Sequence, residues 1–185
     1  MTKSASEVCF TAKLLRPRAA EPAAGGTFLS LPAQASAKLP SRGMTSVEGT
    51  LNGAAFQATL EPDGRGGHWL KVDQRLREAA GAVVNDLVTL QITPVAVEPE
   101  PALPDDLRQA LAAALPTASA TWSRITPVAR RDWIHWITSG KRAETRTKRI
   151  RVALSKLSAG DRRPCCFDRS GMFSKSLSAP VADVT

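Results

Sequence analysis

Two runs of alternating apolar and polar residues flank the pair Asn52-Gly53, and this arrangement constrains the fold more than any other feature of the chain. Both positions of a two-residue β-hairpin loop need a positive φ, which Asn and Gly adopt more readily than other residues. The runs at residues 45–51 and 54–60 therefore predict two antiparallel strands joined by a tight turn. A β-sheet is the expected framework of the first half of the chain.

Further short strands are predicted on both sides of this hairpin, because apolar and polar residues alternate there and turn residues separate the runs. They are expected at residues 8–14, 27–31, 68–72 and 86–93. Two short helices are expected at residues 33–39 and 74–80, and Asp73 can cap the second one. The glycines at 64, 66 and 67 are expected in turns, because glycine adopts the backbone conformations that turns need. They do not indicate a phosphate-binding loop, since no Lys-Ser or Lys-Thr pair follows them.

The segment Glu98-Pro-Glu-Pro101 is the predicted domain boundary, because a proline-rich segment is stiff and extended. Beyond it the apolar residues follow a helical period. Helices are expected at residues 107–115, 118–124, 127–139 and 144–159. Pro116, Gly140 and Gly160 mark helix ends, and Thr126 before Pro127 marks a helix start.

The predicted organisation is α+β and has four parts. A domain of strands covers residues 1–97, a linker covers 98–103, and a basic helical domain of about four helices covers 104–169. Residues 170–185 are expected to form a disordered tail.

The helical period also separates core positions from surface positions. In the third predicted helix Trp133 and Trp136 fall on the apolar stripe, so they are interpreted as core anchors, although exposed tryptophans can also stack on nucleic acid bases. His135 falls on the opposite side. In the fourth helix Arg146 falls on the apolar stripe with Ile150, and a structural ion pair is the expected reason.

The net charge of +8 is placed unevenly along the chain. Residues 1–103 hold equal numbers of basic and acidic side chains, so the whole excess lies in residues 104–185. This asymmetry predicts an acidic partner for the second half, such as nucleic acid, another polyanion or an acidic protein.

The candidate anion-binding residues belong to the last predicted helix and the segment after it. They are Arg142, Lys148, Arg149, Arg162 and Arg163. Such a surface binds a phosphate backbone through release of counterions. The alternative is a solvated helix face with local ion pairs, for example between Glu144 and Lys148.

The cysteines and histidines predict no reaction. Cys165 and Cys166 follow two arginines that can lower a thiol pKa, but adjacent cysteines cannot clamp a metal as a two-residue spacer does. His68 and His135 are expected in turn or surface roles and have no metal-ligand spacing. We therefore predict no catalytic residue, no metal and no cofactor.

No targeting signal is apparent. The first ten residues include Glu7 and no apolar stretch of signal-peptide length, and no run approaches the roughly 20 apolar residues of a membrane span. Three cysteines do not make a disulfide framework. The expected setting is a reducing cytoplasm.

Several segments resemble known families. The chain is similar to a bacterial domain of unknown function in VEGTLNGAAF (47–56), LEPDG (60–64) and VDQRLREAAG (72–81). It resembles the YdeI/OmpD-associated, or bacteriocin-protection, family, which commonly follows that domain, in RDWIHWITSGKRAETRTKRI (131–150). The resemblance covers roughly residues 10–160, and the order of the motifs is specific.

This resemblance implies a small double-split β-barrel, of the class that includes the AbrB-like transcription regulators, followed by helices. The family names come from phenotypes of resistance to antimicrobial agents and from an outer-membrane association, so they imply a fold more than a function. Asn85 stands where the family usually has Gly, and the turn is expected to persist because Asn also tolerates a positive φ.

The leading hypothesis is a non-enzymatic protein of bacterial stress or antimicrobial resistance that binds an unidentified ligand or protein, with a monomer slightly favoured over a dimer. The first alternative is nucleic-acid binding by the basic helices, although the barrel half, where AbrB-like proteins present their DNA surface, is neutral. The second is an enzyme with a pocket between barrel and helices and His68 or Cys165 as its reactive group.

Overall fold

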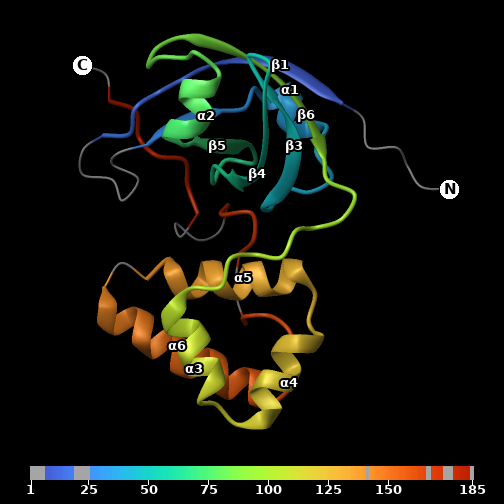
Figure 1. Cartoon of the computed structure of the whole chain (residues 1–185), viewed down its shortest axis with the longest axis vertical. Coiled ribbons are helices and arrows are strands. Elements are labelled where there is room, and N and C mark those ends of the chain that lie inside the picture. The colour runs from blue at the N-terminus through green and yellow to red at the C-terminus, as the bar shows by residue number, and fades with distance from the viewer. Residues whose placement is uncertain (1–6, 19–25, 141, 166–167, 173–176, 184–185) are drawn as a thin grey trace, which may run out of the picture. The chain divides into compact units, whose positions relative to one another are not determined.

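A computed structural model describes residues 7–18, 26–140, 142–165, 168–172 and 177–183 (Figure 1). The chain divides into two compact units, and the chain crosses between them twice. The barrel unit comprises residues 1–97 and 168–185, and the helical unit comprises residues 98–167. The helical unit is therefore inserted, in sequence, between two pieces of the barrel unit.

Six antiparallel strands form the barrel unit, in the order β1-β6-β3-β4-β5-β2. They are β1 (Val8–Lys13), β2 (Thr27–Ser30), β3 (Thr45–Leu51), β4 (Ala54–Pro62), β5 (His68–Val72) and β6 (Leu87–Pro94). Leu15 and Phe28 exchange two backbone hydrogen bonds of 2.8 and 2.9 Å, which join the extension of β1 to β2 and nearly close the sheet. Helices α1 (Ala33–Ala37) and α2 (Gln74–Ala79) connect strands. The predicted small barrel is confirmed.

The hairpin of β3 and β4 forms where the sequence predicts it. Asn52 and Gly53 have φ values of 47° and 87°, and Leu51 pairs with Ala54. The side chain of Asn52 also ties the turn to β6, because its Oδ1 accepts a 2.9 Å hydrogen bond from the Thr89 N–H. Gly49 is required nearby, since a Cβ there would lie 1.9 Å from the carbonyl oxygen of Gln91.

Alternate residues of the strands fill the barrel core. The largest fully buried aliphatic side chains among the described residues of this unit are Leu14, Leu29, Leu51, Leu60, Leu70, Leu90 and Ile92. Val47 and Val88 lie among them. The period of two along each strand therefore places one face of the sheet inside.

The described part of the C-terminal segment packs on the barrel, in contrast to the disordered tail expected from residue 170. Leu177 is 2% exposed. Residues 181–183 add antiparallel pairing to the chain after β1: the Arg18 N–H donates to the Val181 carbonyl and the Asp183 N–H to the Arg16 carbonyl, each at 2.8 Å. The physical reason is that an unpaired strand edge offers N–H and C=O groups to any extended segment that reaches it.

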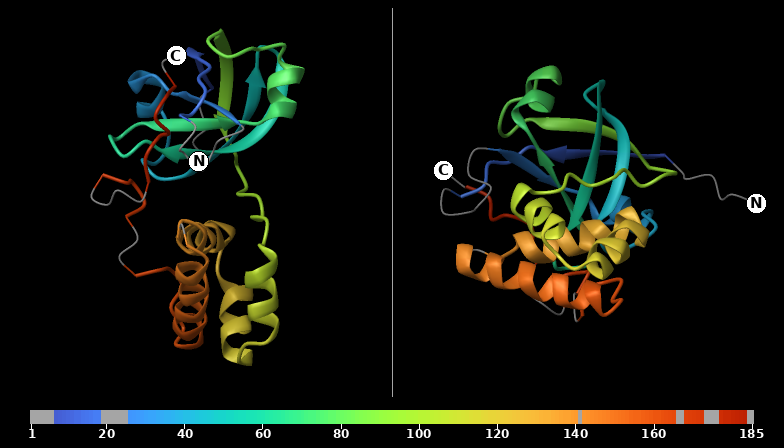
Figure 2. Two further views of the ribbon diagram at one scale, coloured as in Figure 1. Left: turned by 90° about the vertical axis from the view of Figure 1, so that its left-hand side faces the viewer. Right: turned by 60° about the horizontal axis from the view of Figure 1, so that its bottom comes forward.

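Four helices form the helical unit: α3 (Asp105–Ala112), α4 (Pro116–Arg124), α5 (Pro127–Thr138) and α6 (Ala143–Ser158). Pro116, expected to end a helix, is instead the first residue of α4, a position where its missing N–H costs nothing. Thr126 caps α5, since its Oγ1 accepts from the Ala129 N–H at 3.3 Å. Figure 2 shows α4 and α6 side by side. Among the described residues, no helix has the length and apolar character needed to cross a membrane.

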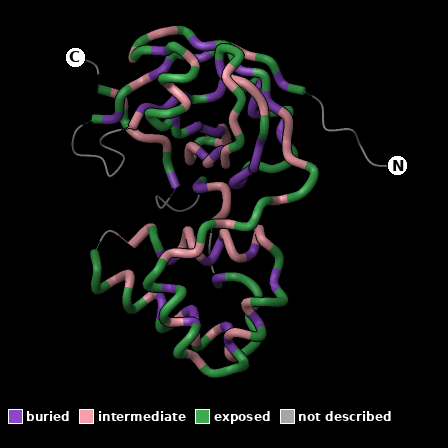
Figure 3. Tube along the Cα trace, viewed as in Figure 1, coloured by how far each residue is buried: buried purple, intermediate pink, exposed green. Residues whose placement is uncertain are grey.

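The apolar stripes of the four helices meet in one core. Its buried members are Leu107, Leu111, Ala118, Ile125, Ala129, Trp133, Ile137, Ile150, Ala153 and Leu157. Figure 3 shows buried and exposed positions alternating along α6, as expected of a helix with one face inside.

The proline-rich segment predicted as a linker is part of the helical unit. Glu98 forms an ion pair with Arg131, and Glu100 with Arg130 at 2.6 Å. Arg130 also donates to the carbonyls of Trp122 and Ser123, at 3.0 and 2.9 Å. Its guanidinium thus joins the segment before α3 to the end of α4, which fixes the segment on the bundle.

Candidate anion-binding surface of the helical unit

Ion pairs engage most acidic side chains of the helical unit. Among its described residues the pairs are Arg108–Asp105, Arg130–Glu100, Arg131–Glu98, Arg146–Asp106 and Lys156–Asp161. A sixth acid, Asp132, is 1% exposed and lies inside the unit. These carboxylates therefore do little to offset the remaining cations.

Five exposed cations outside these ion pairs lie along and after α6 in the described part of the chain: Arg142, Lys148, Arg151, Arg162 and Arg163. A further exposed cation, Arg124, lies at the end of α4. Lys148 and Arg151 are three residues apart and lie on the side of α6 away from its buried Ile150, Ala153 and Leu157. We define these five residues as the basic surface.

The geometry of α6 spreads the basic surface over a long path. Arg142 is the N-cap residue of the helix, and Arg162 and Arg163 follow its C-terminal end. A helix of 16 residues is about 24 Å long. Glu144, also exposed, forms no ion pair with Lys148 within 4 Å, so this local pairing does not neutralise the surface in the part of the chain that is described.

Arg149, predicted with these cations, occupies a different position. Its guanidinium lies over the ring of Trp136, with Cζ 5.3 Å from the ring centroid. One Nη donates to the Trp136 carbonyl at 2.5 Å and to Ser139 Oγ at 2.8 Å. A cation near the last carbonyls of a helix is favourable, so Arg149 serves as a C-terminal cap of α5.

Arg151 was missed in the sequence interpretation. Its signal is its position three residues after Lys148, which places both on one helix face.

Arg146, for which the sequence predicts an ion pair, donates two hydrogen bonds to Asp106. Nε lies 2.5 Å from Oδ2 and an Nη lies 2.9 Å from Oδ1. The hydrogen bond from Arg146 lowers the pKa of the Asp106 carboxyl, and the same bond raises the pKa of Arg146. This pair joins the first turn of α3 to α6.

The two tryptophans of α5 contact each other edge to face, with ring centroids 5.8 Å apart. Trp133 is 0% exposed and thus inaccessible to a nucleic acid base. Trp136 is half-buried, and Arg149 covers a face of its ring.

His68 is fully buried in the barrel unit, which corrects the expected turn or surface role. Nε2 lies 3.1 Å from the Gly43 carbonyl, which can only accept, so Nε2 carries the proton. Nδ1 then accepts from Ser36 Oγ at 3.2 Å, and Ser36 Oγ accepts from the His68 N–H at 3.1 Å. Burial lowers the pKa of His68, so the ring is held neutral.

The other reactive candidates are His135 and the adjacent cysteines. His135, expected at the surface, is instead half-buried. Burial lowers its pKa most, and the positive charges of the nearby Arg131 and Arg149 lower it further. Cys165 is exposed, and Cys166 lies outside the described residues.

Two family models match the chain. A model described as a domain of unknown function (DUF1905) matches residues 10–92, which run from within β1 to within β6 of the barrel unit. A model described as "Bacteriocin-protection, YdeI or OmpD-Associated" matches residues 100–160, which cover helices α3 to α6. A search of curated proteins finds no match to the chain.

Proposed function

Because the chain belongs to the bacteriocin-protection, YdeI or OmpD-associated family and carries a DUF1905 domain before it, we propose that it is a non-enzymatic binding protein of bacterial stress or antimicrobial resistance. We further propose that its helical unit binds a polyanion, with nucleic acid as the specific candidate. The single observation that supports this is the difference between the acids and the cations of this unit.

Among the described residues of this unit, every acid except the exposed Glu144 is in an ion pair or buried, whereas the cations of the basic surface lie outside these ion pairs. Ion pairs engage the carboxylates of Glu98, Glu100, Asp105, Asp106 and Asp161, and burial removes Asp132. The basic surface keeps its guanidinium and ammonium groups in water. Lysine and arginine side chains that meet phosphates release condensed counterions, which supplies most of the affinity for a nucleic acid of any sequence.

The positions of the two tryptophans of α5 favour binding with little sequence preference. Trp133 is buried and Trp136 is stacked against Arg149, so the tryptophan pair does not present a platform for successive bases. Base-specific readout requires side chains that reach base edges, whereas point charges along a helix contact the backbone. We therefore expect binding to both single-stranded and duplex oligonucleotides.

The test is fluorescence anisotropy of labelled oligonucleotides, titrated with the full chain at several salt concentrations. The variant Arg142→Glu/Lys148→Glu/Arg163→Glu removes three exposed cations and leaves Arg146 and Arg149 in place. If the cations contact phosphates, the plot of log K against log salt loses about 0.9 in slope for each contact, or roughly 2 to 3 in all.

A matched control separates local contacts from net charge. The variant Lys38→Glu/Arg65→Glu/Arg75→Glu makes the same change in charge at exposed positions of the barrel unit. It should leave the salt slope nearly unchanged. Equal losses in both triple variants, or no binding by the wild-type chain at low salt, would exclude the basic surface as a nucleic acid site.

A further inference from the structure

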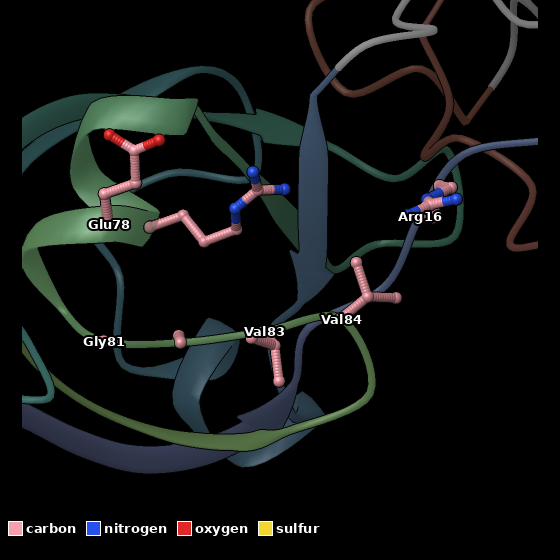
Figure 4. A pocket seen from close by; sticks show the side chains of 7 residues that line it. Arg16, Glu78, Gly81, Val83 and Val84 are labelled. Atoms are coloured by element: carbon pink, nitrogen blue, oxygen red, sulfur yellow. The ribbon is translucent and has the colours of Figure 1, made fainter.

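A pocket of about 640 Å³ opens on the barrel unit between α2 and the segment that leads into β6. Its lining residues are Arg16, Arg77, Glu78, Gly81, Ala82, Val83 and Val84. Figure 4 shows Glu78 and Arg16 at opposite ends of the row formed by Gly81, Val83 and Val84. Pockets of about 300–1,000 Å³ are typical of small-molecule sites.

Backbone and side-chain hydrogen bonds hold the pocket wall in shape. Gly81 has a φ of +59° and ends α2, and the Ala82 N–H reaches back to the Arg77 carbonyl at 3.0 Å. Asp86 Oδ2 accepts from the Val83 N–H at 2.9 Å. Asn85, with a φ of +77°, donates its N–H to the Leu14 carbonyl at 2.7 Å. The wall is thus built before any ligand arrives.

This fixed wall presents an apolar side chain to solvent. Val83 is 64% exposed although its backbone is held on both sides. Ala82, its neighbour, is buried in the barrel core. An apolar group held outward on an ordered segment offers a surface against which an apolar part of a ligand is removed from water.

Two arginines give the pocket its charge. Neither Arg16, which is exposed, nor Arg77, which is half-buried, lies within 4 Å of a carboxylate among the described residues. Glu78 lines the same pocket, but its carboxylate accepts a 2.7 Å hydrogen bond from Gln74 Nε2 along the helix. Two guanidinium groups and one carboxylate favour an anion of low charge.

We propose that this pocket binds a small monoanionic carboxylate with an apolar body, such as an aromatic carboxylic acid. Arg16 and Arg77 contact the carboxylate, because the planar guanidinium matches its geometry, and Val83 and Val84 contact the apolar body. The proposal concerns the barrel unit and does not depend on the polyanion site of the helical unit.

The acids around the pocket select a carboxylate over a phosphate group. Glu78 lines one side, and Asp183 lines an adjoining hollow of about 210 Å³ that shares Arg16 and Val84 with the pocket. A phosphate monoester carries close to two negative charges at neutral pH and would be repelled more strongly by these carboxylates. A carboxylate carries one.

The test is a two-dimensional ¹H–¹⁵N NMR titration of the full chain with benzoate, and with benzyl alcohol as an uncharged probe of similar shape. We expect saturable benzoate shifts centred on the amides of Gly81, Ala82, Val83 and Val84. Benzyl alcohol should bind more weakly than benzoate by a factor of about ten or greater, since charge-assisted hydrogen bonds are lost.

Three variants complete the experiment. Arg16→Gln and Arg77→Gln should each weaken benzoate binding about tenfold, whereas Arg75→Gln, an exposed position of α2 outside the pocket, should not. Unchanged spectra elsewhere verify that each variant is folded. The proposal is overturned if benzoate causes no saturable shift, if benzyl alcohol binds equally well, or if Arg75→Gln weakens binding as much as Arg77→Gln.

Discussion

The guanidinium of Arg149 lies 5.3 Å from the ring centroid of Trp136 and donates a 2.5 Å hydrogen bond to the carbonyl of the same residue. One side chain of α6 therefore contacts both the ring and the backbone of one residue of α5. This contact makes Arg149 a stabilising residue, in spite of its place in a run of basic residues.

Arg149→Gln should lower the free energy of unfolding of the helical unit by about 1–2 kcal/mol, because it removes a cation–π contact and charged hydrogen bonds at a half-buried position. Urea unfolding followed by tryptophan fluorescence measures this. Lys148→Gln, the adjacent exposed cation, should change stability by less than about 0.5 kcal/mol. Equal effects of the two substitutions would contradict the assignment.

The Arg146–Asp106 pair should contribute about 0.5–1 kcal/mol to stability, a modest value because both side chains are partly exposed and water screens them. Since the folded state lowers the pKa of Asp106, this contribution is present above the unfolded-state pKa of about 3.9 and is lost as the pH falls through the folded-state pKa. A double-mutant cycle with Arg146→Gln and Asp106→Asn measures the coupling at pH 7. A coupling that persists unchanged at pH 2 would contradict the ion pair.

His68 should make the barrel unit less stable in mild acid. Its folded-state pKa lies below the unfolded-state value of about 6.5, so the unfolded chain binds the extra proton and the free energy of unfolding falls as the pH drops below 6.5. His135 has the same sign in the helical unit. Unfolding curves from pH 8 to pH 5 for the wild type, His68→Gln and His135→Gln should show a smaller pH slope in each variant.

The hydroxyl of Ser36 has a separate effect, which can be measured at a pH where His68 is neutral. Ser36→Ala leaves the His68 N–H and Nδ1 without the group that satisfies both, which should cost about 1–3 kcal/mol. Chemical denaturation at pH 8, where His68 is neutral in both states, measures this loss. Ser30→Ala, at an exposed position of β2, is the control and should be nearly neutral.

Leu177→Ala should destabilise the barrel unit by about 2–3 kcal/mol, because it removes a buried aliphatic side chain. Val181→Ala keeps the backbone hydrogen bond to Arg18 and alters an exposed side chain, so it should have little effect. Thermal unfolding of both variants distinguishes a packed segment from a disordered one. No difference between the two would favour a disordered tail.

Local sequence signals predicted the elements well. The Asn52-Gly53 turn, the Asp73 cap of α2 and the Thr126 cap of α5 depend on residues within three positions of each other, and such short-range patterns are visible in a sequence. The stripes of buried residues on α5 and α6 follow from the helical period alone.

Features that depend on distant residues were not visible in the sequence. The partners of His68 lie 32 and 25 positions away, so its burial could not be read from its neighbours. Arg16 and Arg77 line one pocket only because the barrel brings the end of β1 near α2. Similarly, Glu100 and Glu98 of the proline-rich segment pair with arginines of α5 that lie 30 and 33 residues later, which composition alone cannot indicate.

The insertion of the helical unit between two pieces of the barrel unit sets an order on protein synthesis. A ribosome makes all six strands first, then residues 98–167, and only afterwards Leu177 and the residues that pair with Arg16 and Arg18. At about 5–20 residues per second, the roughly 80 residues in between take about 4–16 s. During that interval the strand edge at residues 16–18 is open to water and to other nascent chains. The barrel is thus the first unit to begin folding and the last to be completed.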